Sequence, residues 1–153
     1  MAEQPYSYDK KYSTRYTFVS KGKRGAIIKV VEFLPTSNKS ILNLAFVDLR
    51  KDGTIDDTAN SNNGDIIKVM ATIIHIVRDF IDEFPDCKIL FTGSTAQRTK
   101  LYQRILRTYY GIFSKEFDIT ALEEVPENKY EEVIFEPVNN VKNYVAFFVK
   151  RKK

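Results

Sequence analysis

The clearest hydrophobic pattern in the chain lies between residues 62 and 85. Apolar residues recur there at alternating steps of four and three, which places them on one face of a helix. The residues of that face are Ile66, Met70, Ile73, Val77, Phe80 and Phe84, flanked by Ile67, Ile74 and Ile81. The residues of the complementary polar stripe are Lys68, Thr72, His75, Asp79 and Asp82. The spacing therefore predicts an amphipathic helix that buries one side and exposes the other.

Polar residues and a proline mark the two ends of this helix. Asn62, Asn63 and Asp65 precede its first turn, where an Asn or Asp side chain can accept hydrogen bonds from free backbone N–H groups. Pro85 ends the helix, because residues just before a proline are pushed out of the α region. We expect these side chains at the helix start to act as caps.

A short strand and a second helix are expected after Pro85. The stretch KILFT at residues 88–92 predicts a buried strand, and Ser94 and Gln97 have the spacing of a capping box. The second helix should therefore run from near residue 95 to about residue 110. Its expected inner face consists of Leu101, Tyr102, Ile105, Leu106 and Tyr109. Its expected outer stripe consists of Lys100, Arg104 and Arg107, with Arg98 on the first turn.

Shorter apolar stretches predict strands in the rest of the chain. Residues 14–20, 26–34 and 41–49 are joined by short polar turns, which is typical of an antiparallel meander. In the third of these strands, Leu42, Leu44, Phe46 and Asp48 are expected on one side. Three further strands are expected at residues 117–122, 130–135 and 144–150.

The predicted element order is β-β-β-α-β-α-β-β. This order predicts an α+β fold in which two helices cover a mostly antiparallel sheet. The chain has 153 residues, of which 43% are hydrophobic and 29% charged, and this favours a single globular domain spanning residues 1–153. Residues 1–13 and 151–153 are polar and are expected to be loosely ordered.

Cysteine content and hydropathy bear on the compartment. Cys87 is the one cysteine, so no internal disulfide can form, which favours a reducing compartment. The N-terminal residues are polar, unlike a signal peptide, and the longest apolar runs are shorter than a bilayer requires. We therefore expect a cytoplasmic protein with no membrane partner.

Three segments of the chain resemble a bacterial family of domains of unknown function. They read YSTRYTFVSKGKRG, DDTANSNNGDIIKVMATIIHIVRDF and FTGSTAQRTKLYQRIL, and the resemblance extends over most of the chain. It adds little about function, because that family is itself uncharacterised.

The strand order also resembles, remotely, the fold of the GCN5-related N-acetyltransferases (GNAT). The segment ILFTGSTAQRTKLY is similar to the strand-loop-helix segment of that superfamily. This resemblance implies an acyl-CoA N-acyltransferase with acetyl-CoA as cofactor, in which Tyr102 is the general acid that protonates the leaving thiolate. It implies that the coenzyme contacts Asn63, Gly64, Thr95 and Arg98.

Several residues depart from the GNAT pattern. Thr95 stands where the superfamily has an asparagine, and Arg98 stands where it has a small alanine. The expected pyrophosphate loop offers only Gly64, followed by Asp65, and a carboxylate at a helix start repels the phosphate that the helix N-terminus attracts. We therefore favour a non-catalytic domain on an acyltransferase-like scaffold, which binds a protein or small ligand through the 50–65 loop and the 93–98 turn.

Nucleic-acid binding is the third functional hypothesis. Arg98, Lys100, Arg104 and Arg107 can contact phosphates, and interleaved tyrosines can stack on bases. Those tyrosines are Tyr102, Tyr109 and Tyr110. The alternative is a solvated outer helix face with the tyrosines turned inward.

No metal motif is recognised in the sequence. His75 is the single histidine, and the aspartates near the end of the meander lack the spacing of a calcium loop. Those aspartates are Asp48, Asp52, Asp56, Asp57 and Asp65. Glu32, Asp48 and Lys51 could form a magnesium-dependent nuclease site, whereas the alternative is that the acidic residues serve turns and caps.

Charge is distributed unevenly along the chain. Residues 1–30 hold seven basic and two acidic side chains, and residues 116–136 hold one basic and eight acidic ones. One interpretation is two solvated surfaces that attract each other on folding. The other is a two-sided surface that steers an anionic ligand to one side.

Overall fold

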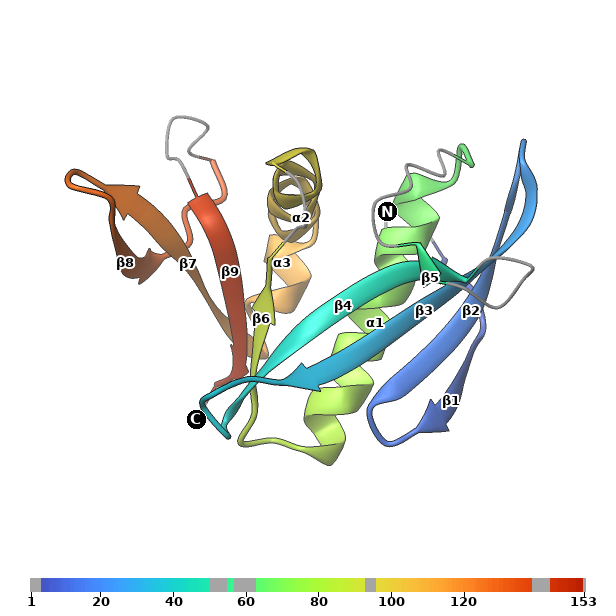
Figure 1. The fold of residues 1–153 in the computed structure, drawn as a ribbon, viewed down its shortest axis with the longest axis horizontal. Coiled ribbons are helices and arrows are strands. Elements are labelled where there is room, and N and C mark those ends of the chain that lie inside the picture. The colour runs from blue at the N-terminus through green and yellow to red at the C-terminus, as the bar shows by residue number, and fades with distance from the viewer. Residues whose placement is uncertain (1–3, 50–54, 57–62, 93–95, 139–143, 153) are drawn as a thin grey trace. The chain divides into compact units, whose positions relative to one another are not determined.

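The computed structural model describes residues 4–49, 55–56, 63–92, 96–138 and 144–152. The fold is α+β, its strands pair mostly antiparallel, and the chain divides into two compact units (Figure 1). The first unit comprises residues 1–34 and 44–84, and the second comprises residues 35–43 and 85–153. None of the described helices combines the length and the apolar composition that a bilayer crossing requires.

The first unit contains strands β1, β2 and β5, helix α1, nearly all of β3 and most of β4. The bounds are Tyr8–Tyr12 for β1, Arg15–Gly22 for β2, Gly25–Pro35 for β3, Ile41–Leu49 for β4 and Ile55–Asp56 for β5. β1, β2 and β3 pair antiparallel in chain order, β4 follows β3, and β5 pairs antiparallel with β4. The predicted meander is confirmed as β2, β3 and β4, whereas β1 and β5 are additional strands.

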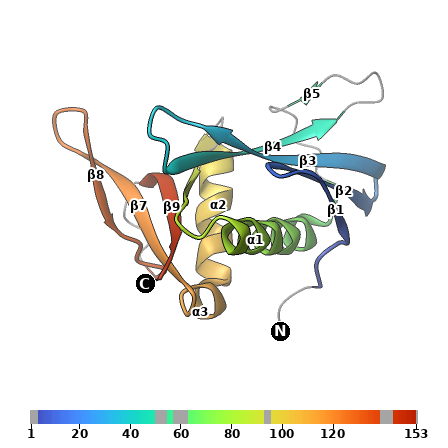
Figure 2. The same cartoon turned by 90° about the horizontal axis from the view of Figure 1, so that it is seen from below.

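Helix α1 (Ile66–Glu83) packs across one face of this sheet (Figure 2). The ring of Phe80 stacks on that of Phe33 in β3, with ring centroids 3.9 Å apart. Met70, Ile73 and Val77 are buried on the same helix, as their spacing predicts. Burying side chains of this size stabilises a fold by about 1.5–3 kcal/mol each, so this face accounts for much of the cohesion of the first unit.

Two features of α1 differ from the prediction. Ile66 and Ile67 are 41% and 40% exposed, because the buried part of the helix starts only at Val69. Thr72 was expected on the wet stripe but is fully buried. Its hydroxyl oxygen accepts a hydrogen bond of 2.9 Å from the backbone N–H of Tyr6, so the N-terminal segment covers this position.

That N-terminal segment also departs from expectation. Residues 8–12 were expected to be loosely ordered because they are polar, but they form β1. The hydroxyl of Tyr8 donates to Asp79, and Lys10 forms an ion pair with Glu83, both on the polar stripe of α1. The polar residues of this segment therefore pair with the charged face of α1.

The second unit contains the remaining strands and two helices. The bounds are Lys88–Phe91 for β6, Phe117–Val125 for β7, Lys129–Ile134 for β8, Tyr144–Arg151 for β9, Ala96–Thr108 for α2 and Tyr110–Phe113 for α3. The strand order is β6-β9-β7-β8, and each neighbouring pair is antiparallel. The predicted strands at residues 88–92, 117–122, 130–135 and 144–150 are thus confirmed.

Two boundaries in the second unit differ from the prediction. The second helix stops at Thr108 and a short helix follows, where one helix to about residue 110 was expected. The C-terminal residues, expected to be loosely ordered, include Arg151 within β9. The backbone N–H of Lys152 also donates to the carbonyl oxygen of Glu116. The pairing of β9 with β7 therefore continues almost to the end of the chain.

Helix α2 packs against β9 and covers one face of the second unit's strands. The ring of Tyr102 lies edge-on to that of Phe91 in β6, with centroids 5.7 Å apart. The buried residues that the strands contribute to this core are Ile89, Phe91, Phe117, Ile119, Ala121, Tyr144, Phe147 and Val149. The alternating residues of the same strands point to the opposite face, which none of the described helices of this unit covers.

Candidate functional site

Asn63, expected to contact a coenzyme, is buried in a dense set of hydrogen bonds. Its side-chain amide donates to the hydroxyl of Ser20 at 3.1 Å and to the carbonyl oxygen of Gly25 at 2.9 Å. Its side-chain oxygen accepts from the backbone N–H of Arg24 at 2.6 Å, and its main-chain oxygen accepts from that of Lys23 at 3.1 Å. Asn63 therefore ties the β2–β3 turn to the start of α1. We call this set of bonds the Asn63 latch.

Asp65 stands at the N-cap of α1, yet its side chain makes no capping hydrogen bond. Its Oδ2 atom instead accepts from the hydroxyls of Tyr6 and Ser20, both at 2.5 Å. The predicted cap is wrong, because these two hydroxyls draw the carboxylate toward β2. Burial, together with the hydrogen bond to this carboxylate, raises the pKa of Tyr6.

The expected coenzyme site is described only in part. Gly64 has a φ of +82°, a left-handed conformation that a residue with a side chain rarely adopts. Asn63 and Gly64 belong to the first unit, and Arg98 belongs to the second. Thr95 and most of the 50–65 loop lie outside the described residues. In the part that is described, the polar side-chain atoms of Asn63 are already used within the protein.

Tyr102, the candidate general acid, is 3% exposed. Burial raises the pKa of its hydroxyl, and the nearby charge of Arg98 opposes that shift. Arg98 itself is half-buried in the first turn of α2. This tyrosine is therefore part of the packing between α2 and β6.

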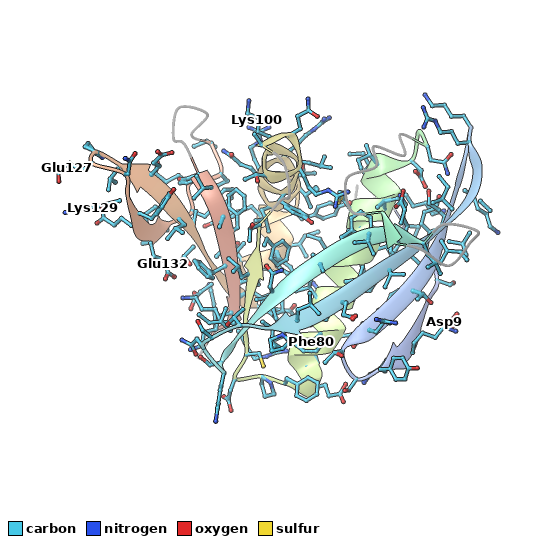
Figure 3. All side chains as sticks on the ribbon, in the orientation of Figure 1. Asp9, Phe80, Lys100, Glu127, Lys129 and Glu132 are labelled. Carbon is cyan, nitrogen blue, oxygen red and sulfur yellow. The ribbon has the colours of Figure 1, made fainter. Side chains whose placement is uncertain are left out.

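The basic stripe of α2 is arranged as its spacing predicts. Lys100, Arg104 and Arg107 are exposed, and Figure 3 shows Lys100 on the side of α2 that points away from the strands. Tyr102 and Tyr109 are buried, so these two rings cannot stack on bases. Cationic side chains thus lie exposed along α2, but two of the three tyrosines point inward.

Two of the residues suggested for a magnesium site, Glu32 and Asp48, are engaged in ion pairs. Lys29 and Asp48 form a buried pair, with Nζ and Oδ1 2.5 Å apart. Arg15 binds both carboxylate oxygens of Glu32, at 2.7 and 2.9 Å. Lys51 lies outside the described residues. Within the described part of the chain, no group of three His, Cys, Asp or Glu side chains is placed to hold a metal ion.

His75 and Cys87 occupy ordinary positions. His75 is exposed on the polar stripe of α1, and partial burial and the charge of Arg78 lower its pKa. Cys87 is half-buried, and burial raises the pKa of its thiol, opposite to what activates a nucleophile. Neither residue points to catalysis.

The uncovered side of the second unit's strands is the feature that sequence reasoning missed. We call it the open face. It consists of Lys88 and Leu90 in β6, Ala146, Phe148 and Lys150 in β9, Asp118, Thr120, Leu122 and Glu124 in β7, and Tyr130, Glu132 and Ile134 in β8. All of these side chains except that of Ala146, which is buried, are at least partly exposed to solvent. Among them, Ile134 is 76% and Tyr130 57% exposed.

A polar cluster lies among the apolar side chains of the open face. Lys88 donates to both carboxylate oxygens of Glu132, at 2.7 and 3.0 Å, and the hydroxyl of Thr120 donates to the same carboxylate at 2.6 Å. The ammonium of Lys88 also lies 4.5 Å from the ring centroid of Phe148. Burial acts to raise the pKa of Glu132, but the hydrogen bonds and the charge of Lys88 outweigh it and lower the pKa.

Strand β8 is the outermost strand of the second unit and pairs with β7 alone among the described strands. All but one of its side chains, that of Val133, are exposed. Figure 3 shows Glu127 and Lys129 at the tip of the β7–β8 hairpin and Glu132 farther along β8. Val138, just beyond the strand, is 89% exposed. An outermost strand with exposed apolar side chains is a natural place for another chain to bind.

Comparison with known proteins agrees with the first resemblance. Residues 2–152 match the model of a family of unknown function, DUF6934. Searches of curated proteins and of solved structures found no match to the chain. The resemblance to an uncharacterised domain family is confirmed, whereas the resemblance to the GNAT fold stays a prediction. With almost its whole length matched, the chain belongs to DUF6934, a family whose function is unknown.

Proposed function

We propose that this chain is a non-catalytic binding domain that holds a protein partner on the open face and along β8. One observation carries the proposal: Ile134 and Tyr130 are both exposed on one face of an outermost strand, each two positions from Glu132. Covering a side chain of this size stabilises a complex by about 1.5–3 kcal/mol. The open face therefore offers exposed apolar side chains beside a paired polar cluster, and protein interfaces likewise combine apolar and hydrogen-bonded polar contacts.

The arrangement of the polar groups supports binding over coenzyme chemistry. Asn63 is occupied by the latch, and Asp65 keeps a carboxylate at the start of α1, where it opposes a phosphate. The binding segments expected from the sequence, residues 50–65 and 93–98, lie mostly outside the described residues. The surface proposed here is instead formed by strands that the structure describes fully.

The proposal is tested by selecting ligands without assuming their identity. A random peptide library is panned against the folded domain, and the selected peptides are mapped by NMR on the isotope-labelled protein. We expect shifts at Leu122, Glu132 and Ile134, and loss of binding in Ile134→Ser. The matched control is Ile112→Ser, which changes an isoleucine exposed by 52% on α3. Shifts confined to other surfaces, or equal loss in both variants, would refute the proposal.

A second measurement, of Tm with added coenzyme, distinguishes an acyltransferase from a non-catalytic domain. A ligand at a hundred times its Kd stabilises a protein by about 2.7 kcal/mol. We expect no change in Tm with coenzyme A or acetyl-CoA at millimolar concentration. Acetyl transfer to an amine that disappears in Tyr102→Phe would contradict a non-catalytic role.

Nucleic-acid binding is a second candidate, favoured by the exposed basic stripe of α2. Lys100, Arg104 and Arg107 repeat at steps of four and three and so share one side of the helix. Binding through them should weaken steeply with salt, because contacts to phosphates release counterions. Fluorescence anisotropy with a labelled single-stranded oligonucleotide, at two salt concentrations, tests this candidate. Unchanged affinity in Arg104→Glu/Arg107→Glu would exclude this stripe.

A further inference from the structure

We infer that β8 accepts an extended basic segment of a partner protein as an additional strand. This inference rests on the proposed function and specifies the partner and the binding mode. Three observations carry it: the direction of the backbone groups of β8, the side chains beside them, and the charge of the surrounding strands.

The backbone of β8 has groups directed away from β7. In an antiparallel pair, residues alternate between those that exchange hydrogen bonds with the partner strand and those that do not. The N–H of Phe135 donates to the carbonyl oxygen of Ile119, which places Phe135 in the first class. Counting back along β8 in the observed register assigns Ile134, Glu132 and Tyr130 to the second class. The N–H and C=O groups of these three residues therefore point outward, where a further strand would pair.

The same three residues present their side chains on the open face. An added strand places every second side chain on that face, next to Ile134 and Tyr130. Apolar residues at those alternate positions of the partner would cover both exposed side chains. Backbone pairing and apolar contact thus come from one set of residues, as in other cases where a peptide extends a sheet edge.

Charge selects a basic partner. Glu123 faces Glu131 directly across the β7–β8 pair, and Glu124 is exposed beside them. Glu127 is exposed at the hairpin tip, and Lys129 is the one basic residue between positions 116 and 136. Like charges placed opposite each other destabilise a sheet, and opposite charges stabilise it. Lysine or arginine side chains of an incoming strand would lie beside the exposed carboxylate of Glu131 and attract it.

The same charge disfavours pairing of β8 with β8 of a second copy. A symmetric antiparallel pair would bring two copies of the Glu131 and Glu132 region together, with four carboxylates in a short stretch. The occupant is therefore a different segment, extended and basic. A second copy of this chain remains as an outcome that the experiment can detect.

The test uses two synthetic peptides of about eight residues, a typical strand length. One repeats Lys-Val-Lys-Thr and the other repeats Glu-Val-Glu-Thr. Anisotropy of the labelled peptides gives the affinities, and hydrogen exchange on the whole chain gives the amides that become protected. We expect the lysine peptide to bind at least tenfold more tightly, with new protection at Tyr130, Glu132 and Ile134.

Two variants separate backbone pairing from side-chain contact. Ile134→Pro removes an outward N–H without removing a hydrogen bond to β7, and Ile134→Thr keeps that N–H. We expect Ile134→Thr to weaken binding of the lysine peptide, because apolar contact is lost, and Ile134→Pro to abolish it. Glu131→Lys should weaken binding at least fivefold, whereas Asp9→Lys, the same charge change in the first unit, should not. If Ile134→Pro fails to fold, the inference is tested by comparing Glu131→Lys with Asp9→Lys and by the hydrogen-exchange pattern of the wild-type chain.

Several results would overturn the inference. These are equal affinity for the two peptides, protection outside β8, or full binding by a folded Ile134→Pro. Self-association of the chain that protects β8 without peptide would show that the occupant is a second copy. If the library peptides bind the open face but are not basic, the proposed function is supported and only this inference is refuted.

Discussion

The main-chain oxygen of Asn63 lies 1.9 Å from the position that a Cβ atom on Gly22 would occupy. The β2–β3 turn and Asn63, three positions before α1, are therefore in backbone contact, and only glycine fits at position 22. This contact makes the Asn63 latch possible, because it brings the backbone N–H groups of Lys23 and Arg24 within hydrogen-bond distance of Asn63.

Replacing Gly22 should therefore be costly. In Gly22→Ala, the added methyl group would force the backbone of the turn away from Asn63, and overpacking of this kind costs about 1–3 kcal/mol. The matched control is Gly111→Ala, where an added Cβ meets no atom within 4 Å inside helix α3. Alanine should leave this site unchanged or stabilise it by up to about 1 kcal/mol. Urea unfolding of both variants checks this, and equal stabilities would contradict it.

The Asp65 carboxylate should be a structural acceptor. In Asp65→Ala, the hydroxyls of Tyr6 and Ser20 lose their shared partner, which should cost about 1–3 kcal/mol. Tyr6→Phe should cost less, and the double variant should be less destabilised than the sum of the two single variants. Asp86→Ala, at an exposed aspartate, serves as the control and should stay within about 0.5 kcal/mol. If the losses of stability in Asp65→Ala and Tyr6→Phe simply added in the double variant, this would argue against the hydrogen bond between Tyr6 and Asp65.

The buried pair of Lys29 and Asp48 should respond asymmetrically to substitution. Asp48→Ala leaves a buried ammonium without its carboxylate and should cost about 3–5 kcal/mol. Lys29→Met/Asp48→Leu removes both charges and keeps apolar volume beside Phe46, so most of that loss should be recovered. Denaturant unfolding measures both. A double variant as unstable as Asp48→Ala would mean that the pair itself, and not the stranded charge, carries the stability.

The pH dependence of stability near neutrality should trace to His75, the only histidine. Its pKa is lower in the folded chain than the ordinary value of 6.5, so the unfolded chain binds this proton more readily. Stability should therefore be fully present above about pH 7 and should fall as the pH drops below the unfolded pKa. Tm measured between pH 7.5 and 5.5 should decline in the wild type and stay flatter in His75→Gln. A parallel decline in both proteins would assign the effect to other groups.

Local periodicity was sufficient to predict most of the elements. The spacing of Met70, Ile73, Val77 and Phe80 identified the buried face of α1, because a helix repeats on a scale that the sequence itself displays. The burial of Thr72 could not be predicted in this way. It depends on the backbone of Tyr6, which is 66 positions away in the chain.

The candidate surface was harder to predict than the elements that form it. The stretch at residues 130–135 was identified as a strand, but its exposure depends on β9 inserting between β6 and β7 and leaving β8 outermost. Strand order is not encoded in the alternation of a single strand. A usable signal was the pair of glutamates in that stretch, Glu131 and Glu132, since two adjacent charges are rare in a strand buried on both sides.

The Asn63 latch also bears on how the gene can be edited. The turn at Lys23 and Arg24 resembles a hairpin tip that would tolerate an insertion. Lengthening it, however, would break the hydrogen bonds from these two backbone N–H groups to Asn63 and so loosen the start of α1. The β7–β8 tip at Glu127 and Asn128 has exposed side chains and no comparable tether among the described contacts. An epitope tag or a fluorescent reporter is therefore better spliced at the second tip, provided that its linkers leave β8 accessible.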